Sequence, residues 1–263
     1  MLRSMYSGIS GMKNFQTKLD VIGNNIANVN TYGFKKGRTV FKDMVSQTMQ
    51  GATGPSASRG GINTKQVGLG AQMSAIDTID TQGSMQTTGR TLDLAISGDG
   101  YFKVSDGTNS YYSRAGNFYL DTNGDLVNSD GYYLQQTGNQ KINIPQTATD
   151  ISIGKDGKVS YTAGGNLVTT PPQIELAKFS NPGGLSKTGN NLFAETKNSG
   201  TAQLDVPGKP GFGTIESGML EMSNVDLSEE FTDMIVAQRG FQANTRIITT
   251  SDQILEELVN LKR

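Results

Sequence analysis

Apolar residues recur at helical spacing over the first part of the chain. They follow one another at steps of three and four residues, which places them as one stripe on one face of an α-helix. The stripe comprises Leu2, Met5, Ile9, Met12, Phe15, Leu19, Ile22, Ile26 and Val29. A stripe this narrow is typical of a seam against another helix rather than of a face that covers a broad core. The asparagines and Gly33 that follow predict the end of the helix.

A second helix is predicted at the opposite end of the chain. Asp226 is suited to cap its start, with Glu229 three residues later as in a capping box. Four of its apolar residues recur every seven positions, so each is expected to bury a large side chain against another helix. The apolar positions of this helix are Leu227, Phe231, Met234, Phe241, Ile248, Leu255 and Val259.

Between the helices the hydrophobic pattern changes from a helical period to a period of two. Leu92–Ile96 alternates, and two turn signals, Asn123-Gly124 and Asp156-Gly157, separate short apolar runs. Further strands are expected at Lys141–Ile144 and Ile174–Phe179. Short strands at this spacing predict an antiparallel β-domain, sandwich or barrel-like. The predicted class is α+β, with a discontinuous, coiled-coil-like helical domain (1–34 with 219–263), a linker or hairpin (35–70) and a central antiparallel β-domain (71–218).

Glycine has two different uses in this sequence. Gly8, Gly11 and Gly23 interrupt the first helix, and their small size favours close approach of a neighbouring backbone. The Gly51–Gly61 stretch has the composition of a linker or a hairpin tip. A plain surface loop is the simplest interpretation of this stretch. Its place between a terminal helix and the next strands also makes it a candidate hinge, formed by Gly51, Gly54, Gly60 and Gly61.

The composition excludes several kinds of chemistry. The 263 residues include no Cys, no His and no Trp, and 35% are hydrophobic. Without His and Cys the chain lacks the commonest general base and any thiolate nucleophile. A net charge of −1 gives no electrostatic reason to expect nucleic acid or an anionic membrane as a partner. No apolar run approaches a membrane span, and the amino terminus has no cleavable signal peptide, so we expect no direct membrane insertion.

Two local motifs resemble ligand sites without completing them. Asp121–Asp125 resembles the start of a calcium loop, but Leu126 and Tyr132 occupy the positions that need Gly and an acid. Gly98-Asp99-Gly100 lacks the third glycine of a dinucleotide loop and is typical of a turn. We therefore predict no catalytic residue, no metal site and no cofactor, and the chain is not expected to be an enzyme.

The ends of the chain resemble the axial proteins of the bacterial flagellum, the rod and hook subunits. The resemblance rests on Leu19–Lys35 at one end and on Met222–Leu227 and Met234–Asn244 at the other. Gly89–Ile96 and Tyr112–Phe118 match in the middle, so the resemblance covers nearly the whole chain. It implies a protein that leaves the cytoplasm through the flagellar type III export apparatus and assembles with copies of itself into a hollow helical tube. The implied assembly interface is Leu2, Met5, Ile9, Met12, Leu19, Ile22, Asn25, Ile26, Val29, Leu227, Met234, Phe241, Ile248 and Leu255.

Within this family the chain looks most similar to the short hook proteins of Gram-positive bacteria. This resemblance implies a torque-transmitting hook, with the hook cap, the distal rod and the hook–filament junction proteins as neighbours. The distal rod protein is the alternative, because Gln47–Lys65 is as long as the insertion typical of that protein. A remote alternative from another class is a β-type binding module that its terminal helices merely dimerise.

Overall fold

The chain folds into two compact units. The computed structural model describes residues 2–55, 59–168 and 170–261. One unit comprises Met1–Ala27, Gly37–Asp77 and Asp226–Arg263, and the other comprises Asn28–Lys36 and Thr78–Val225. The first holds the two terminal helices and a long hairpin, and the second holds the antiparallel sheets. The predicted α+β class, with helices at both ends and an antiparallel β-region between them, is confirmed.

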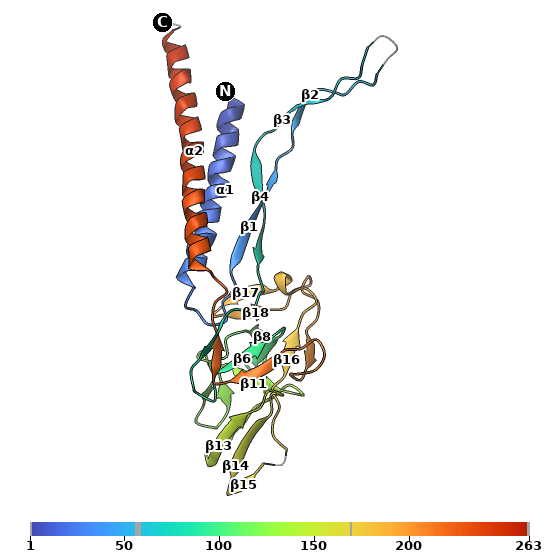
Figure 1. The fold of residues 1–263 in the computed structure, drawn as a ribbon, viewed down its shortest axis with the longest axis vertical. Helices are drawn as coiled ribbons and strands as arrows, with labels where there is room; N and C mark the ends of the chain where they lie inside the picture. The colour runs from blue at the N-terminus through green and yellow to red at the C-terminus, as the bar shows by residue number, and fades with distance from the viewer. Residues whose placement is uncertain (1, 56–58, 169, 262–263) are drawn as a thin grey trace. The chain divides into compact units, whose positions relative to one another are not determined.

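The terminal helices form an antiparallel pair. α1 (Leu2–Ala27) and α2 (Leu227–Asn260) lie side by side (Figure 1). Asp226 is the N-cap of α2, since its carboxylate accepts hydrogen bonds from the backbone N–H groups of Ser228 at 2.8 Å and Glu229 at 3.5 Å. The predicted start of the second helix is therefore confirmed.

The same unit contains a hairpin of two successive ribbons. β1 (Gly37–Asp43) pairs with β4 (Ala71–Thr78), and farther out β2 (Gln47–Gln50) pairs with β3 (Lys65–Val67). A bridge between Thr53 and Ile62 extends the ladder. The Gly51–Gly61 stretch lies at the far end of this hairpin, and its residues 56–58 fall outside the described part of the chain.

The second unit is built from short strands joined by tight turns. The predicted hairpins around Asn123-Gly124 and Asp156-Gly157 are confirmed, and both glycines have positive φ, of 82° and 74°. The elements are β5 (Met85–Thr87), β6 (Leu94–Ser97), β7 (Tyr101–Ser105), β8 (Ser110–Ser113), β9 (Tyr119–Leu120), β10 (Leu126–Val127), β11 (Tyr133–Gln136), β12 (Gln140–Lys141), β13 (Ala148–Ile153), β14 (Val159–Ala163), β15 (Asn166–Leu167), β16 (Leu176–Lys178), η1 (Pro182–Gly184), β17 (Ser186–Gly189), β18 (Leu192–Ala194), β19 (Gln203–Asp205), β20 (Thr214–Ser217) and β21 (Met219–Glu221).

Strand β7 is the centre of the largest sheet. The main path through that sheet is β17-β18-β8-β7-β11-β10-β9, and β16 also pairs with β7 and carries β19. Three further pairings complete the unit: β13-β14-β15, β20 with β6, and β21 with β5. All of these ladders are antiparallel.

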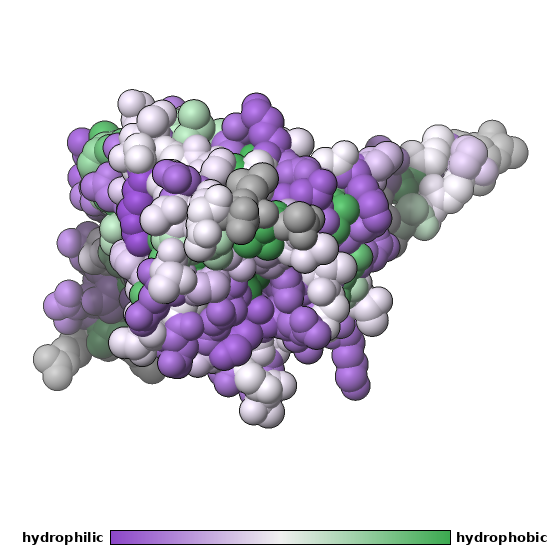
Figure 2. Space-filling view, turned by 90° about the horizontal axis from the view of Figure 1, so that it is seen from below, coloured by the Kyte–Doolittle hydropathy of each residue, from purple (hydrophilic) through white to green (hydrophobic). Residues whose placement is uncertain are grey.

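Alternation along β7 builds two hydrophobic clusters. Phe102 and Val104 belong to the larger cluster, while Tyr101 points to the other face and packs against Phe179 and Phe193. All five residues of this strand are buried, including Lys103, whose ammonium pairs with the Glu175 carboxylate at 3.2 Å. Seen from the end at which β13, β14 and β15 lie, the surface is mostly hydrophilic or neutral, and hydrophobic atoms appear only in small separate areas (Figure 2).

The unit boundaries differ from the divisions expected from the sequence at three places. Residues 28–34, expected with the helices, lie in the β-unit, and so do residues 219–225. The hairpin arm Gly37–Asp77 groups with the helices, although residues 35–70 were expected as a separate linker and residues from 71 onward as part of the β-domain. The segment between α1 and the hairpin is therefore an integral part of the β-unit.

Candidate assembly interface

Large side chains on one terminal helix face glycines on the other. A Cβ atom added to Gly240 of α2 would lie 2.5 Å from Cζ of Phe15 on α1. In the opposite sense, a Cβ on Gly11 would lie 3.0 Å from the Asn244 amide, and one on Gly8 would lie 3.5 Å from Ile248. These contacts let the two helix backbones approach closely and fix which residues lie opposite each other. No atom lies within 4 Å of such a Cβ on Gly23, so this glycine has no part in the seam.

The residues predicted on α1 lie at different depths. Ile22 and Asn25 are buried, with exposures of 3% and 2%. The others are all half-buried: Met5, Ile9, Met12, Leu19, Ile26 and Val29. Val29 follows the helix and belongs to the β-unit, and the side chain of Leu2 lies outside the described residues. The half-buried members retain apolar surface that the single chain does not cover.

The heptad residues of α2 follow the same pattern. All four are half-buried, whereas Leu227 at the start of the helix is 39% exposed; the four are Met234, Phe241, Ile248 and Leu255. Ala237 and Ser251 lie between them along the seam and are buried. The sequence pattern did not predict these two because it was drawn from large apolar residues alone. Ala237 and Ser251 each lie seven residues from Asn244, and this heptad spacing indicates that all three share one face of the helix.

A second apolar stripe on α2 is exposed. Three of its members directly precede a residue of the seam with α1, and one helical residue corresponds to a turn of about 100°, so the stripe is rotated by about 100° from the seam. Its members are Val236, Ile247, Ile254 and Leu258, with 55%, 45%, 43% and 49% of their surface exposed. Isolated exposed hydrophobic residues are ordinary, but a row along one face of a helix marks a contact surface. In the single chain Ile247 lies beside Gly8 of α1, but all four side chains keep at least 43% of their surface exposed.

Glu221 is the centre of a buried charge network in the β-unit. Its carboxylate accepts hydrogen bonds from Lys35 Nζ at 2.6 Å, from Arg114 Nη1 at 3.2 Å and from the backbone N–H of Gly83 at 3.0 Å. Its backbone carbonyl accepts from the N–H of Gly33 at 2.8 Å. Burial lowers the pKa of Lys35, and the nearby Glu221 charge only partly opposes this shift. The network ties the Asn28–Lys36 segment to β21.

Two residues of the terminal motifs complete this junction. Gly33 has φ of 69°, and a Cβ there would lie 2.5 Å from the backbone nitrogen of Ala115, so only glycine fits. The Asn224 amide donates to the carbonyls of Ile79 at 2.9 Å and Thr81 at 3.2 Å, and its oxygen accepts from the N–H of Lys36 at 2.8 Å. One asparagine side chain thus joins three stretches of backbone.

The four candidate hinge glycines lie on the outer part of the hairpin. None of them has a positive φ in this structure, and within the described residues a Cβ on Gly51, Gly54 or Gly60 meets no atom within 4 Å. A Cβ on Gly61 would lie 3.1 Å from the carbonyl oxygen of Thr53. Only Gly61 is therefore closely packed, and a hinge role for these glycines remains a prediction.

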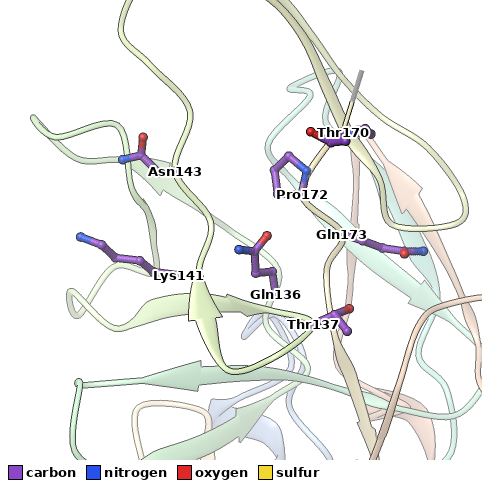
Figure 3. A pocket seen from close by; sticks show the side chains of 8 residues that line it. Gln136, Thr137, Lys141, Asn143, Thr170, Pro172 and Gln173 are labelled. Atoms are coloured by element: carbon purple, nitrogen blue, oxygen red, sulfur yellow. The ribbon is translucent and has the colours of Figure 1, made fainter. Parts of the chain in front are cut away.

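A polar surface pocket of about 450 Å³ lies beside β11 and β12 (Figure 3). Its polar side chains are already engaged. Asn143 donates to Asp125 at 2.7 Å, Gln173 donates to the carbonyl of Asp156 at 2.7 Å, and Lys141 pairs with Asp125 at 2.5 Å. Because these groups satisfy one another, we assign no ligand to this pocket.

Two other searches gave no candidate site within the described residues. Residues 2–55, 59–168 and 170–261 contain no group of three or more acidic side chains placed to hold a metal ion. Over the same ranges, neither helix combines the length and the apolar character needed to cross a membrane.

Comparison with known proteins identifies the family. Three family profiles match: the flagellar hook protein FlgE/F/G D1 domain at residues 95–161, the flagellar basal body rod FlgEFG protein C-terminal region at 216–261, and the flagella basal body rod protein at 5–35. The flagellar basal-body rod protein FlgG of Bacillus subtilis is 60% identical over 264 residues, covering all of both chains. The chain belongs to the flagellar rod and hook family.

Other members of this axial family show the same full-length similarity. The basal-body rod protein FlgG of Caulobacter vibrioides is 42% identical over 99% of this chain and all of the relative. The flagellar hook protein FlgE of Borreliella burgdorferi is 32% identical, covering all of both chains over 441 aligned positions. The chain is therefore a structural component of the bacterial flagellum and not an enzyme.

Proposed function

We propose that this chain is a subunit of the distal rod, and that many copies assemble into a hollow tube that transmits torque through the basal body. The hook, which the sequence alone favoured, becomes the second candidate. The 60% identity to a protein named as a rod protein, over the full length of both chains, carries this choice. The rod relatives of Bacillus subtilis and Caulobacter vibrioides support it together.

The length of the hook relatives argues in the same direction. Aligning this chain of 263 residues with the hook protein of Borreliella burgdorferi takes 441 positions. That relative therefore carries a long additional segment, whereas the Bacillus subtilis rod relative aligns over 264 positions. In a rod made of subunits of this length, the extended hairpin from Gly37 to Thr78 would contact neighbouring copies.

The exposed stripe of α2 supports self-assembly. One face of α2 packs on α1 through Gly240, Asn244 and Ile248, whereas Val236, Ile254 and Leu258 stay largely exposed. The four stripe side chains are 43–55% exposed, so completing their burial would contribute about 0.7–1.5 kcal/mol each, half of what burial from full exposure contributes. Helices from neighbouring copies would supply that burial and form the inner wall of the tube. Export through the flagellar type III apparatus would deliver each copy to the growing end.

Complementation tests the assignment. The chain is expressed in a Bacillus subtilis strain that lacks its own FlgG and, separately, in a strain that lacks its hook protein. We expect basal bodies with complete rods, and swimming cells, only in the first strain. Rescue of the hook strain alone would overturn the rod assignment and favour the hook. Failure to form tubes from purified protein under any condition that assembles the Bacillus subtilis relative would overturn self-assembly.

A further inference from the structure

The Asn25 side chain forms a clamp between α1 and the first strand of the hairpin. Its oxygen accepts a hydrogen bond from the N–H of Gly37 at 3.0 Å, and its nitrogen donates to the carbonyl of the same residue at 2.9 Å. The carboxamide thus pairs with both polar groups of Gly37, as a neighbouring strand would. Asn25 is only 2% exposed, so water does not compete for these bonds.

Glu230 connects the same clamp to α2. Its Oε2 atom accepts the second proton of the Asn25 amide at 3.1 Å, and Glu230 is 6% exposed. One buried side chain therefore contacts the last turn of α1, the first residue of β1 and the first turn of α2. Replacing its amide by an apolar group would leave buried polar groups of Gly37 and Glu230 without partners, which is costly.

Other contacts hold the hairpin more loosely. The Phe15 and Phe41 rings are 6.4 Å apart at their centroids, and Phe41 is 37% exposed. Arg38 and Asp77 form an ion pair at 3.6 Å with both side chains largely exposed, and such pairs contribute little. A two-stranded hairpin has no core of its own and is marginal in water. The Asn25 bonds are therefore a buried polar connection at its base, and Gly70 packs against Ser7 and Ser10 farther along α1.

We propose that Asn25 is a positioning residue that fixes the β1–β4 hairpin to the helix pair, so that helices and hairpin act as one rigid arm in the assembled tube. The proposal rests on the proposed function for the role of this arm in a tube, whereas the clamp itself is a property of the single chain. A rigid arm presents the hairpin at one orientation to every neighbouring copy, and this uniformity favours a straight tube.

A reciprocal exchange of chemical groups tests the clamp. Asn25→Asp keeps the acceptor for Gly37 N–H, removes both donors and places a carboxylate against the Glu230 carboxylate. Glu230→Gln alone keeps an acceptor for the Asn25 amide. Combined, the two changes restore a donor–acceptor pair with its direction reversed, since the amide introduced at position 230 then donates to the carboxylate introduced at position 25. If Asn25→Asp only destabilised the fold in a general way, the added Glu230→Gln change would not restore it.

Hydrogen exchange in assembled tubes measures the result. We expect the Gly37 amide to exchange about tenfold faster in Asn25→Asp tubes, because repulsion from Glu230 and loss of the bond to the Gly37 carbonyl displace the side chain that accepts from this amide. The double variant removes the repulsion and should recover part of the protection, and electron micrographs should show bent tubes for the single variant and straighter tubes for the double. Asn24→Asp is the control for a negative charge at the same end of α1, and it should leave the exchange of Gly37 unchanged.

Each outcome decides the proposal. Wild-type exchange at Gly37 in Asn25→Asp tubes, or a double variant no better than the single one, would overturn the clamp. If the single variant forms no tubes, tubes from the double variant support the clamp and their absence overturns it. A wild-type chain that forms tubes but does not rescue the FlgG-deficient strain contradicts the rod assignment and leaves the clamp standing.

Discussion

Gly240 of α2 and Gly23 of α1 are both helical glycines, and replacement by alanine is expected to hinder assembly more at Gly240 than at Gly23. A Cβ at Gly240 would lie 2.5, 2.7 and 2.9 Å from three atoms of the Phe15 ring, whereas a Cβ at Gly23 meets no atom within 4 Å. The Phe15 ring also lies near Phe41, with 6.4 Å between the centroids. Moving the ring away from an added methyl group would therefore disturb this second contact.

The size of the effect follows from two opposing terms. Alanine favours a helix over glycine by about 1 kcal/mol, and this gain applies at both positions. Overpacking at Gly240 costs about 1–3 kcal/mol and is absent at Gly23. The two variants should thus differ by about 1–3 kcal/mol, which corresponds to about 5- to 150-fold in the subunit concentration at which tubes begin to form.

Sedimentation of tubes over a series of subunit concentrations measures this difference. We expect Gly23→Ala to lower the subunit concentration at which tubes begin to form. Gly240→Ala should need a higher concentration than Gly23→Ala, and combining Phe15→Leu with Gly240→Ala should recover part of this loss. Equal thresholds for the two alanine variants would refute the close seam between the helices. A combined variant no better than Gly240→Ala would show that the Phe15 ring is not the obstacle.

Three further outcomes are expected. Val236→Asp should abolish tubes without unfolding the β-unit, whereas Gln242→Asp, on another exposed face of α2, should not. Tubes from Val236→Asp would remove the second stripe from the interface. Burial raises the pKa of Tyr112 to about 12 and also raises the pKa of Tyr101, so absorbance at about 295 nm should show these two ionising after the exposed tyrosines. The pKa of Tyr112 in the folded chain lies above the ordinary value of about 10. The contribution of this tyrosine to stability is therefore complete below about pH 10 and is lost as the pH rises through about 12. Ionisation of Tyr112 together with the exposed tyrosines would contradict its burial. Replacing the four glycines of Gly51–Gly61 by alanine should allow export and stiffen the tube, and unchanged curvature in micrographs would leave a plain loop.

Local signals in the sequence predicted local structure. The Asp226 cap and the Asn123-Gly124 turn depend on residues within a few positions of one another, so their patterns were sufficient. A linker or hairpin was expected over residues 35–70, but the strand β1 was not predicted, because Lys35–Arg38 is basic and glycine-containing and the half-buried positions of β1 do not alternate regularly with the exposed ones.

Long-range polar contacts could not be predicted in the same way. Glu221 lies 186 residues from Lys35 and 107 from Arg114, and each of these residues alone is typical of a surface charge. Asn25 was expected in the interface through a family motif, but nothing in the sequence joins it to Glu230, 205 residues away. Such pairs become visible only when the fold brings distant segments together.

The central claim is that the terminal helices complete their packing only against neighbouring copies. Hydrogen exchange on verified monomers and on assembled tubes tests it most directly, over the amides of Ile9–Ile26 and Met234–Leu255. Ordering a residue costs about 1–2 kcal/mol, and α1 contains three glycines, so a single seam with one face of α2 largely exposed is expected to leave the pair poorly ordered in the monomer. We predict fast exchange in the monomer and slow exchange in the tube. Strong protection of both helices in the monomer would contradict this account.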